Sequence, residues 1–537
     1  MRPAQSRWIF CALLTSVILL SLAASSAQTF SVIHNIDCTT DGCKDQQPVP
    51  MTQGRDGNLY GQTYSGGLND DGTVWKVTPA GTFTNLASFA YPASNTATGG
   101  LALALDGNYY GVDDHGGAND LGYVFKLTPA GVLTDIHDFT NVEGGFDGEP
   151  LTLGPDGNLY GLDWYNCYFF KVTVSTGVYT NVSSTCPQGT FYQLTLGADG
   201  RFYGVATSNG TDGKGFVFAI STAGKVTVLH NFNGTDGEFP LGSLVQANDG
   251  NFYGVTQQTP TNPNAGEIFK MTPAGVVSTL HTFAADGSDG TSPESGLVSA
   301  SDGNLYGTTT SGGANNGGTI FKVTRTGTFT VLHNFSCSTN GCDSWVPLAQ
   351  HTNGTLYGFA QGGGSNNAGT VFKLASTAFT KFIVVQNYSG KTGSTVDILG
   401  TGFTGATAVN FGAVPATSFK IVNNTFITAV VPPTAITGLV SVTTTTGKVS
   451  TLKNLKIAPS ITAFTPVSGA VGTAVTITGT AFTGATKVTF GGVAATEFTV
   501  NSVTKITATV PTGALTGKIV VTTPGGAGTS AANFTVE

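Results

Sequence analysis

A small set of side chains in this sequence has types and neighbours that could do chemistry. Most are acidic or aromatic, and one is a histidine beside two aspartates. Aromatic rings offer flat apolar faces for sugar rings, carboxylates accept hydrogen bonds from hydroxyl groups, and a carboxylate beside a histidine could act as an acid and base pair. These candidates stand outside the recurring motif described below: Asp113, Asp114, His115, Glu149, Asp163, Trp164, Tyr165, Glu238, Glu294 and Trp345.

Binding is the favoured interpretation of these residues, and catalysis is the alternative. The separation of two carboxyl groups, on which glycoside hydrolysis depends, is not encoded in the spacing of loop residues. The sequence holds no GxSxG, HExxH, P-loop or EF-hand motif. A purely structural interpretation is also open, in which Trp164 and Trp345 only cover sheet edges. The catalytic residues, if any, are therefore left unassigned.

Metal ions and disulfides are the next chemistry to weigh. The loop around Asp286 and Asp289 has oxygen ligands that could hold Ca²⁺, but short Asp-Gly turns usually need no metal, so we expect no cofactor. The cysteines lack the CxxC spacing of zinc sites. They instead form three local pairs, which predict three disulfides: Cys38–Cys43, Cys167–Cys186 and Cys337–Cys342.

Composition limits the fold and the partners. Only 10% of the 537 residues are charged, 40% are hydrophobic and 74 are glycine, which suits many short strands and excludes an all-helical protein. Residues 28–377 carry 28 acidic and 12 basic side chains, a net of −16, whereas residues 378–537 carry 3 and 9, a net of +6. An acidic body is a poor partner for nucleic acid, so we expect none.

The first 27 residues have the pattern of a secretory signal peptide. Arg2 and Arg7 precede an apolar run from Trp8 to Leu22, and small residues follow up to Ala27. We expect cleavage after Ala27. The run is shorter than a spanning helix needs and no second one follows, which predicts export without a membrane span in the mature chain.

A repeated hairpin motif dominates the next 350 positions. Asp-Gly-Asn-Leu-Tyr-Gly at 56–61 recurs with small changes at 106, 156, 199, 249, 302 and 353. Its tyrosines are spaced by 43 to 53 residues, the length of one four-stranded propeller blade: Tyr60, Tyr110, Tyr160, Tyr203, Tyr253, Tyr306 and Tyr357. The sequence therefore predicts an all-β, seven-bladed β-propeller over residues 28–377.

Strand order within a repeat follows from the best-formed copy. We expect strands A to D at 296–300, 304–309, 319–324 and 328–335, with tight A–B and C–D turns on one face and long loops on the other. The chain begins with a D-like strand at Phe30–Ile36, which would close the ring on strand C at Thr370–Leu374. Phe379–Val385 is the alternative seventh D strand.

From residue 378 the period changes. Ser389-Gly390 to Phe403 matches Ser468-Gly469 to Phe482 at an offset of 79 residues, and Val409–Gly412 matches Val488–Gly491 at the same offset. Short Val- and Thr-rich strands argue for tandem sandwiches. We expect two immunoglobulin-like domains, at 378–457 and 458–537, leaving from the tight-turn face.

Two resemblances follow from these motifs. DGNLYGxTxxGGxxxxGTxFKxT with a following LHxF, in residues 30–377, resembles the tandem repeats of secreted bacterial proteins known as GloVer-containing or choice-of-anchor repeat proteins. SGxxGxxVxIxGxxF and VxFGxVxA, in residues 378–537, resemble IPT/TIG domains of bacterial surface proteins. The resemblances imply an extracellular or cell-surface setting and supply no catalytic residues.

The DGN-aromatic hairpin is also distantly similar to streptogramin-lyase-like propellers, whose resemblance would imply a metal-dependent enzyme with a catalytic histidine. This chain has tyrosine where those repeats usually have tryptophan, and no histidine matches by motif. We therefore expect a secreted or cell-surface binding protein. Its propeller loop face would recognise an extracellular glycan or protein, and its Ig-like domains would act as spacer or attachment modules on anionic surface polymer.

Overall fold

The fold is built of strands alone. The computed structural model describes residues 28–42, 51–63, 65–68, 70, 72–89, 100–140, 150–163, 168–184, 193–259, 265–387 and 389–537. Across these residues every regular element is a β-strand, so there is no helix long and apolar enough to cross a membrane. The signal peptide predicted for residues 1–27 lies outside the described residues.

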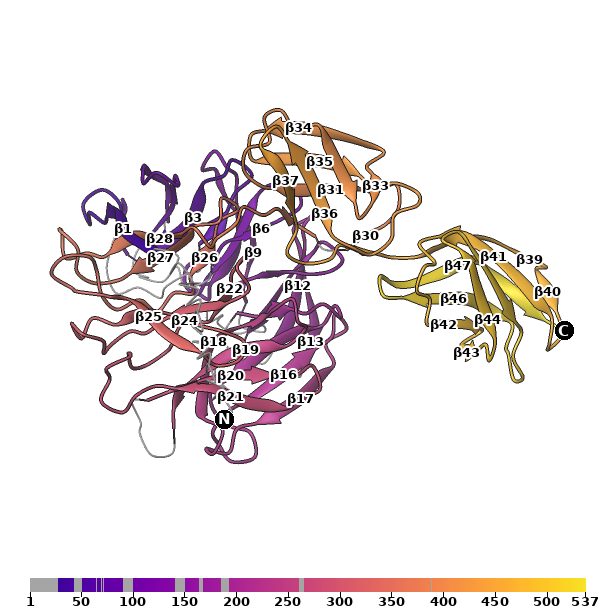
Figure 1. The fold of residues 1–537 in the computed structure, drawn as a ribbon, viewed down its shortest axis with the longest axis horizontal. Coiled ribbons are helices and arrows are strands. Elements are labelled where there is room, and N and C mark those ends of the chain that lie inside the picture. The colour runs from indigo at the N-terminus through magenta and orange to yellow at the C-terminus, as the bar shows by residue number, and fades with distance from the viewer. Residues whose placement is uncertain are drawn as a thin grey trace, which may run out of the picture.

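Seven antiparallel sheets of four strands form the propeller within the described residues (Figure 1). Each blade has its strands in the order A, B, C, D from the centre outwards. Blades 1 to 3 comprise β2 (Thr52–Gln53), β3 (Leu59–Thr63), β4 (Thr73–Val77) and β5 (Phe83–Ser88); β6 (Ala102–Leu103), β7 (Tyr109–Asp113), β8 (Tyr123–Leu127) and β9 (Leu133–Asp138); and β10 (Thr152–Leu153), β11 (Leu159–Asp163), β12 (Tyr168–Thr173) and β13 (Val178–Ser183).

Blades 4 to 7 repeat this plan. They comprise β14 (Thr195–Leu196), β15 (Phe202–Ala206), β16 (Phe216–Ile220) and β17 (Val226–Asn231); β18 (Glu238–Gln246), β19 (Phe252–Gln258), β20 (Glu267–Met271) and β21 (Val277–Thr282); β22 (Val298–Ser299), β23 (Leu305–Thr308), β24 (Thr319–Val323) and β25 (Phe329–Asn334); and β26 (Ala349–Gln350), β27 (Leu356–Ala360), β28 (Thr370–Ser376) and β1 (Gln28–Asn35). The predicted number of blades and their strand order are confirmed.

The Asp-Gly hairpin is held by the aspartate that opens it. In blade 1, Asn58 donates its backbone N–H to Asp56 Oδ1 (3.1 Å), and the Tyr60 hydroxyl donates to Asp56 Oδ2 (2.9 Å). Gly57 has a φ of 78°, which a residue with a Cβ rarely adopts. The same tyrosine-to-aspartate bond recurs in blades 2 to 6. These aspartates therefore serve the scaffold, as their repetition predicts.

The ring closes through the N-terminal strand. Phe30 of β1 lies opposite Leu374 of β28, and Asn35 lies opposite Thr370. The alternative, in which Phe379–Val385 supplies the seventh D strand, is wrong, because β29 (Val384–Val385) pairs with β31 of the following sandwich. Closure by strands from both ends of the propeller leaves blade 7 with the same four strands as the other blades.

Histidines of strand D join neighbouring blades. Three of them bond an aspartate in the following loop, at 2.7 to 2.9 Å: His34 with Asp41, His230 with Asp236 and His281 with Asp289. Rings of the next blade stack on them, for example Phe329 on His281 with centroids 3.8 Å apart. The strand D histidines are thus distributed around the rim in five of the seven blades. In blade 6 the partner of His333 is Asn340, whose amide donates to Nε2 (3.1 Å).

The propeller is expected to lose stability as the pH falls from about 6.5 to about 4. Burial lowers the pKa of His333 to about 4, and its neutral partner Asn340 opposes this only weakly. The unfolded chain therefore binds the proton first, so protonation favours unfolding in that pH window. Asn340→Asp supplies the carboxylate found beside the other histidines, so it should raise the pKa of His333 and flatten this loss. Urea unfolding at a series of pH values, with an NMR titration of His333, measures both effects.

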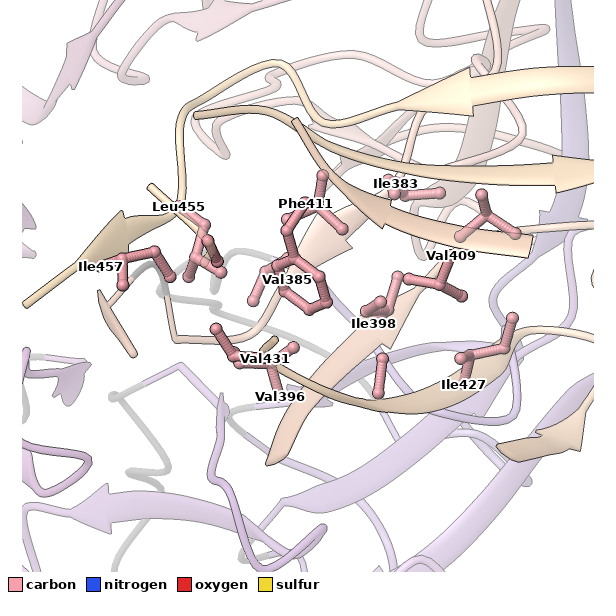
Figure 2. Close-up of a cluster of buried hydrophobic side chains, with 14 of the residues drawn as sticks. Ile383, Val385, Val396, Ile398, Val409, Phe411, Ile427, Val431, Leu455 and Ile457 are labelled. Carbon is pink, nitrogen blue, oxygen red and sulfur yellow. The ribbon is translucent and has the colours of Figure 1, made fainter. Parts of the chain in front are cut away.

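Two sandwiches follow the propeller. In the first, the sheet β29, β31 (Thr395–Leu399), β35 (Phe426–Val430) and β34 (Ser418–Asn423) faces the sheet β33 (Val414–Pro415), β32 (Ala408–Phe411), β36 (Val440–Thr444) and β37 (Gly447–Ser450). Strands β30 (Ser389–Gly390) and β38 (Lys456–Ile457) pair in parallel. Alternating residues such as Ile398, Ile427 and Phe411 meet between the sheets (Figure 2).

The second sandwich has the same plan. Its sheets are β39 (Ser460–Thr465), β41 (Ala474–Thr480), β45 (Lys505–Thr509) and β44 (Phe498–Ser502), and β40 (Ser468–Gly469), β47 (Gly526–Val536), β46 (Gly517–Thr523), β42 (Lys487–Phe490) and β43 (Val493–Ala494). Figure 1 shows the first sandwich (orange) against the propeller and the second (yellow) projecting away from it. The predicted pair of Ig-like domains is confirmed.

The first Ig-like domain docks on the tight-turn face of the propeller, as expected. In blades 1, 6 and 7 the residue just before Asp-Gly, or Asn-Gly in blade 7, makes a side-chain contact with residues 380–401. Arg55 binds Asp397 (2.5 Å), the Ser301 hydroxyl accepts from Thr380 N–H (3.1 Å), and the Thr352 and Thr401 hydroxyls bond each other (2.9 Å). The opposite face, made of the B–C and D–A loops, is called the loop face below.

One predicted disulfide is fully described. Cys337 and Cys342 are bonded, with Cα atoms 4.7 Å apart. Cys38 is also disulfide-bonded, but its predicted partner Cys43 lies outside the described residues. The third predicted pair, Cys167 and Cys186, lies outside them too.

Candidate functional site

The acidic B–C loops of the loop face prove to be scaffold. Asp70, Asp120 and Asn316 have φ values of 65°, 56° and 56°, and each side chain accepts the backbone N–H of the glycine four residues earlier. Aspartate and asparagine tolerate this left-handed conformation better than other residues with a side chain. Their recurrence across blades shows that these polar loop residues shape the turn.

The D–A loops entering blades 5 to 7 share a left-handed residue that is not glycine. Phe239, Ser292 and Asp343 have φ values of 54°, 53° and 63°, and each follows a glycine of positive φ by two positions. Such conformations are costly for phenylalanine and serine and persist only where surrounding structure holds them. The backbone therefore has the same conformation before the residue two positions further on. That residue is Leu241, Glu294 or Trp345. Glu294 and Trp345 precede the innermost strands β22 and β26, whereas Leu241 lies within β18.

Four residues form the candidate site, which we call the inner rim: Gln257 of β19, and Glu294, Asp343 and Trp345 of the D–A loops. The Gln257 amide donates to Glu294 Oε1 (3.2 Å), and the Trp345 indole N–H donates to Asp343 Oδ1 (2.6 Å). The Trp345 side chain is half-buried. The inner rim thus combines an indole ring, an amide and two carboxyl groups contributed by blades 5, 6 and 7.

The surroundings of Glu294, which include the second carboxyl group of the inner rim, shift its pKa. Burial raises the pKa of Glu294, the bond from Gln257 opposes that rise, and the negative charge of Asp343 adds to it. Glu294 therefore holds a proton to higher pH than an exposed glutamate does. A desolvated carboxyl group beside an aromatic ring can accept or donate hydrogen bonds to hydroxyl groups of a ligand.

Buried hydroxyl groups fix the loops that carry the inner rim. The Ser295 and Thr308 hydroxyls bond each other (2.9 Å), and the Thr308 hydroxyl donates to the Ser344 carbonyl (2.8 Å). The Ser344 hydroxyl donates in turn to the Phe359 carbonyl (2.8 Å). All three hydroxyl-bearing side chains are at most 1% exposed. This chain of bonds runs from blade 6 to blade 7 and preorganises the residues beside it.

The candidate residues Asp113, Asp114 and His115 lie together on blade 2. Blade 1 stands between them and blade 7 of the inner rim. His115 donates its backbone N–H to Asp113 Oδ1 (3.2 Å), and its ring nitrogen lies 3.1 Å from Asp114 Oδ1. Asp113 is 4% exposed, whereas the His115 side chain is 49% exposed. Only His115 of this run is therefore freely presented to solvent.

The remaining candidates are placed differently. Glu238 forms an ion pair with Lys214 (2.5 Å), which ties the D–A loop to the B–C loop of blade 4. Asp163 ends β11 and is 2% exposed. Glu149, Trp164 and Tyr165 lie outside the described residues.

The loop considered for calcium has its carboxylates in other roles. Asp286 Oδ1 accepts the backbone N–H of Ser288 (2.9 Å), while Asp289 accepts from His281 and from the N–H of Ala284. Within the described ranges, no three histidine, cysteine, aspartate or glutamate side chains gather as metal ligands.

Sequence reasoning singled out Glu294 and Trp345 but missed Gln257 and Asp343. The sequence does carry a signal for Asp343. When the three loops are aligned on Gly237, Gly290 and Gly341, Asp343 falls two positions after the glycine, where the backbone is left-handed. Gln257 has no such signal, since it reaches Glu294 from a different blade.

The comparisons with known proteins concern architecture. The profile of the Gloeobacter/Verrucomicrobia repeat matches residues 19–191 and 190–413, and that of the IPT/TIG domain matches residues 459–536. No curated protein sequence matches the chain. This combination of domains fits a surface or binding protein and is compatible with an extracellular location.

Solved structures with similar folds include propeller enzymes. A virginiamycin B lyase from Staphylococcus aureus is 14% identical over 65% of this chain and 99% of its own, with a TM-score of 0.46. A PQQ-bound aldose sugar dehydrogenase from Streptomyces coelicolor is 12% identical over 65% and 99%, with a TM-score of 0.37. Likeness at this level carries no argument about activity.

Proposed function

Because the chain belongs to the Gloeobacter/Verrucomicrobia repeat family, we propose that it is an extracellular or cell-surface binding protein whose inner rim recognises a glycan. The observation that carries the proposal is the geometry around Trp345. Its indole N–H is held by Asp343, which fixes the orientation of a ring that stays partly open to solvent. A fixed indole face suits stacking against a sugar ring.

The other inner-rim groups complete this chemistry. Glu294 and the Gln257 amide supply acceptors and donors for sugar hydroxyls beside the ring. The left-handed conformation of Ser292, which is costly for serine, fits a loop that the surrounding structure holds in place. The disulfide between Cys337 and Cys342 further restrains the loop that carries Trp345.

Trp345→Ala should weaken glycan binding about 10- to 100-fold, because a central aromatic contact at an interface is typically worth 1 to 3 kcal/mol. A glycan array with the full mature chain would identify the ligand, and isothermal titration with the best glycan would give the affinity of each variant. His115→Ala, on blade 2 of the same face, is the matched control and should keep the wild-type affinity.

Two results would contradict this assignment. If Trp345→Ala bound as tightly as the wild type, the inner rim would not be the site. If His115→Ala lost binding instead, the site would lie on blade 2. If the array detected no glycan and the chain captured a defined extracellular protein, the ligand would be a protein and not a glycan.

An enzyme acting on a glycan is the second candidate, and the raised pKa of Glu294 beside Asp343 favours it. A glutamate that stays protonated to higher pH is suited to act as a general acid. Release of reducing ends from a bound polysaccharide, lost in Glu294→Gln, would establish hydrolysis. Binding without any product would support the binding role.

The Ig-like domains are proposed as spacer and attachment modules. Residues 378–457 carry six lysines and one aspartate, so this part of the chain is basic while the propeller is acidic. Exposed lysines such as Lys420 on β34 would contact anionic surface polymer. A pull-down on cell walls that weakens with added salt would support this attachment, whereas salt-independent retention would contradict it.

A further inference from the structure

A cavity of about 330 Å³ lies on the tight-turn face, where the first Ig-like domain meets the propeller. Blades 5 and 6 form two of its walls, and a turn of the Ig-like domain forms the third. The lining comprises Val245, Gln246, Asn248, residues 298–303, Leu452 and Lys453. Cavities at domain interfaces are frequent ligand sites, and this volume suits a molecule with a single ring.

The cavity lies where blade 6 lacks a bridge that three other blades make to the preceding blade. In three blades a glutamine at the end of strand A accepts a backbone N–H from the preceding blade, at 2.7 to 2.9 Å: Gln53 from Thr352, Gln246 from Ala198 and Gln350 from Ser301. Blade 6 has Ser299 at that position. Its side chain is too short to cross to Asn248 of blade 5, so the space between the two hairpins stays open.

Lys453 lines this space and has no counterion among the described residues. Among the described residues it makes no ion pair or hydrogen bond, and desolvation by the protein around it lowers the pKa of its ammonium group. The side chain of Lys453 is exposed to solvent, and the residue lines the cavity. Its ammonium group is therefore available to pair with an anion that enters the cavity.

The one carboxylate in the lining is otherwise engaged. Asp302 accepts hydrogen bonds from the backbone and side chain of Asn304 (3.1 and 2.8 Å) and from the Tyr306 hydroxyl (2.7 Å). It serves the hairpin, as the equivalent aspartates do in other blades. The lysine charge is therefore left for a partner from outside the chain.

We propose that this cavity binds a small organic acid of about the size of one uronic acid, whose carboxylate pairs with Lys453. The apolar side chains of Val245, Val298 and Leu452 would pack against its body, and Asn248 and Ser299 offer hydrogen-bonding groups. The site is on the opposite face from the inner rim and does not depend on the function proposed for it.

The test is isothermal titration of the full mature chain with glucuronate, using glucose as the uncharged match and inorganic phosphate as an anion without an organic body. Glucuronate should bind, and glucose and phosphate should bind at least about tenfold more weakly. Lys453→Met should weaken glucuronate binding by more than about tenfold, since it removes the charge partner. Ser299→Gln should do the same by filling this space with the glutamine that bridges blades at three other junctions.

Lys420→Met, at an exposed lysine of the same domain, is the control for net charge and should bind as the wild type does. If the wild type did not bind glucuronate, or if Lys453→Met and Ser299→Gln both bound it unchanged, the proposal would be wrong. Equal affinity for phosphate would also overturn it, because it would reveal a general anion site. Trp345→Ala should leave this binding intact, which separates the outcome from that at the inner rim.

Discussion

Arg55→Ala is expected to lower the free energy of unfolding by about 3 kcal/mol, because it leaves the carboxylate of Asp397 without its partner at the domain interface. The Arg55 and Asp397 side chains are 22% and 17% exposed. The guanidinium also donates to Gln386 Oε1 (2.9 Å) and to the Leu105 carbonyl (2.9 Å), and it lies 4.5 Å from the centre of the Phe426 ring. Urea unfolding of wild type and variant measures the difference.

The decrease in the free energy of unfolding caused by Arg55→Ala should be larger at pH 7 than at low pH. Burial already raises the pKa of Asp397 while Arg55 opposes the rise, so removing Arg55 raises it further. The folded state then binds a proton more tightly than the unfolded state, and folded stability increases as the pH falls through the raised pKa. If the stability difference between wild type and Arg55→Ala did not change with pH, the unpaired carboxylate of Asp397 would not be its cause.

Arg201→Ala is the matched control for Arg55→Ala. Arg201 lies on the equivalent hairpin of blade 4 and pairs with Asp199 at 2.6 Å, but their side chains are 36% and 43% exposed. Exposed ion pairs contribute about 0 to 1 kcal/mol. If both arginine variants lost the same stability, the interface would not hold the first Ig-like domain in the way described here.

Phe30→Ala is expected to lower the free energy of unfolding by about 3 kcal/mol, because Phe30 belongs to the strand that closes the ring. Its ring stacks on His333 of blade 6 with centroids 3.7 Å apart, and it lies 5.4 Å from Phe372 of blade 7 and 5.9 Å from Phe335. Removing it opens a cavity at the junction of the first and last parts of the propeller. Unfolding monitored by urea and by calorimetry would record the change.

Phe379→Ala provides the comparison for this closure. Phe379 lies in the segment that could have supplied the last strand, and it contacts Tyr306 edge-on at 5.3 Å. Since it takes no part in the sheet of blade 7, we expect a loss of about 1 to 2 kcal/mol. A larger loss for Phe379→Ala than for Phe30→Ala would mean that the wrong segment had been assigned to closure.

Much of the fold is predictable because its determinants are local and repeated. An Asp-Gly pair forms its turn from bonds within five residues, such as Tyr60 to Asp56, whatever the rest of the chain does. Repetition then predicts the number of blades, and the D-like sequence at the N-terminus indicates one way in which the ring could close. The choice between β1 and Phe379–Val385 was open in sequence, because both have strand-like composition, and only the pairing of Val384–Val385 with β31 removes the alternative.

The candidate sites were predictable only in part. Trp345 and Glu294 stand out in sequence because the repeat does not demand them, but repetition cannot show which neighbours they meet. Asp113 and Glu238 looked equally singular, yet Asp113 is buried and Glu238 is paired with Lys214. The same reasoning overvalued the acidic B–C loops, where Asp70 and Asp120 form turns.

The sequence by itself determined the strand pattern, the seven repeats, the tandem sandwiches and the local disulfide of Cys337 with Cys342, because each depends on residues close together in the chain. The tertiary structure alone decided what residues distant in the chain do together. Arg55 meets Asp397 across 342 positions, and Lys453 lines a gap that Ser299 leaves open. Such contacts arise when separately specified units pack, and burial and charge at those junctions depend on three-dimensional placement that no local pattern encodes.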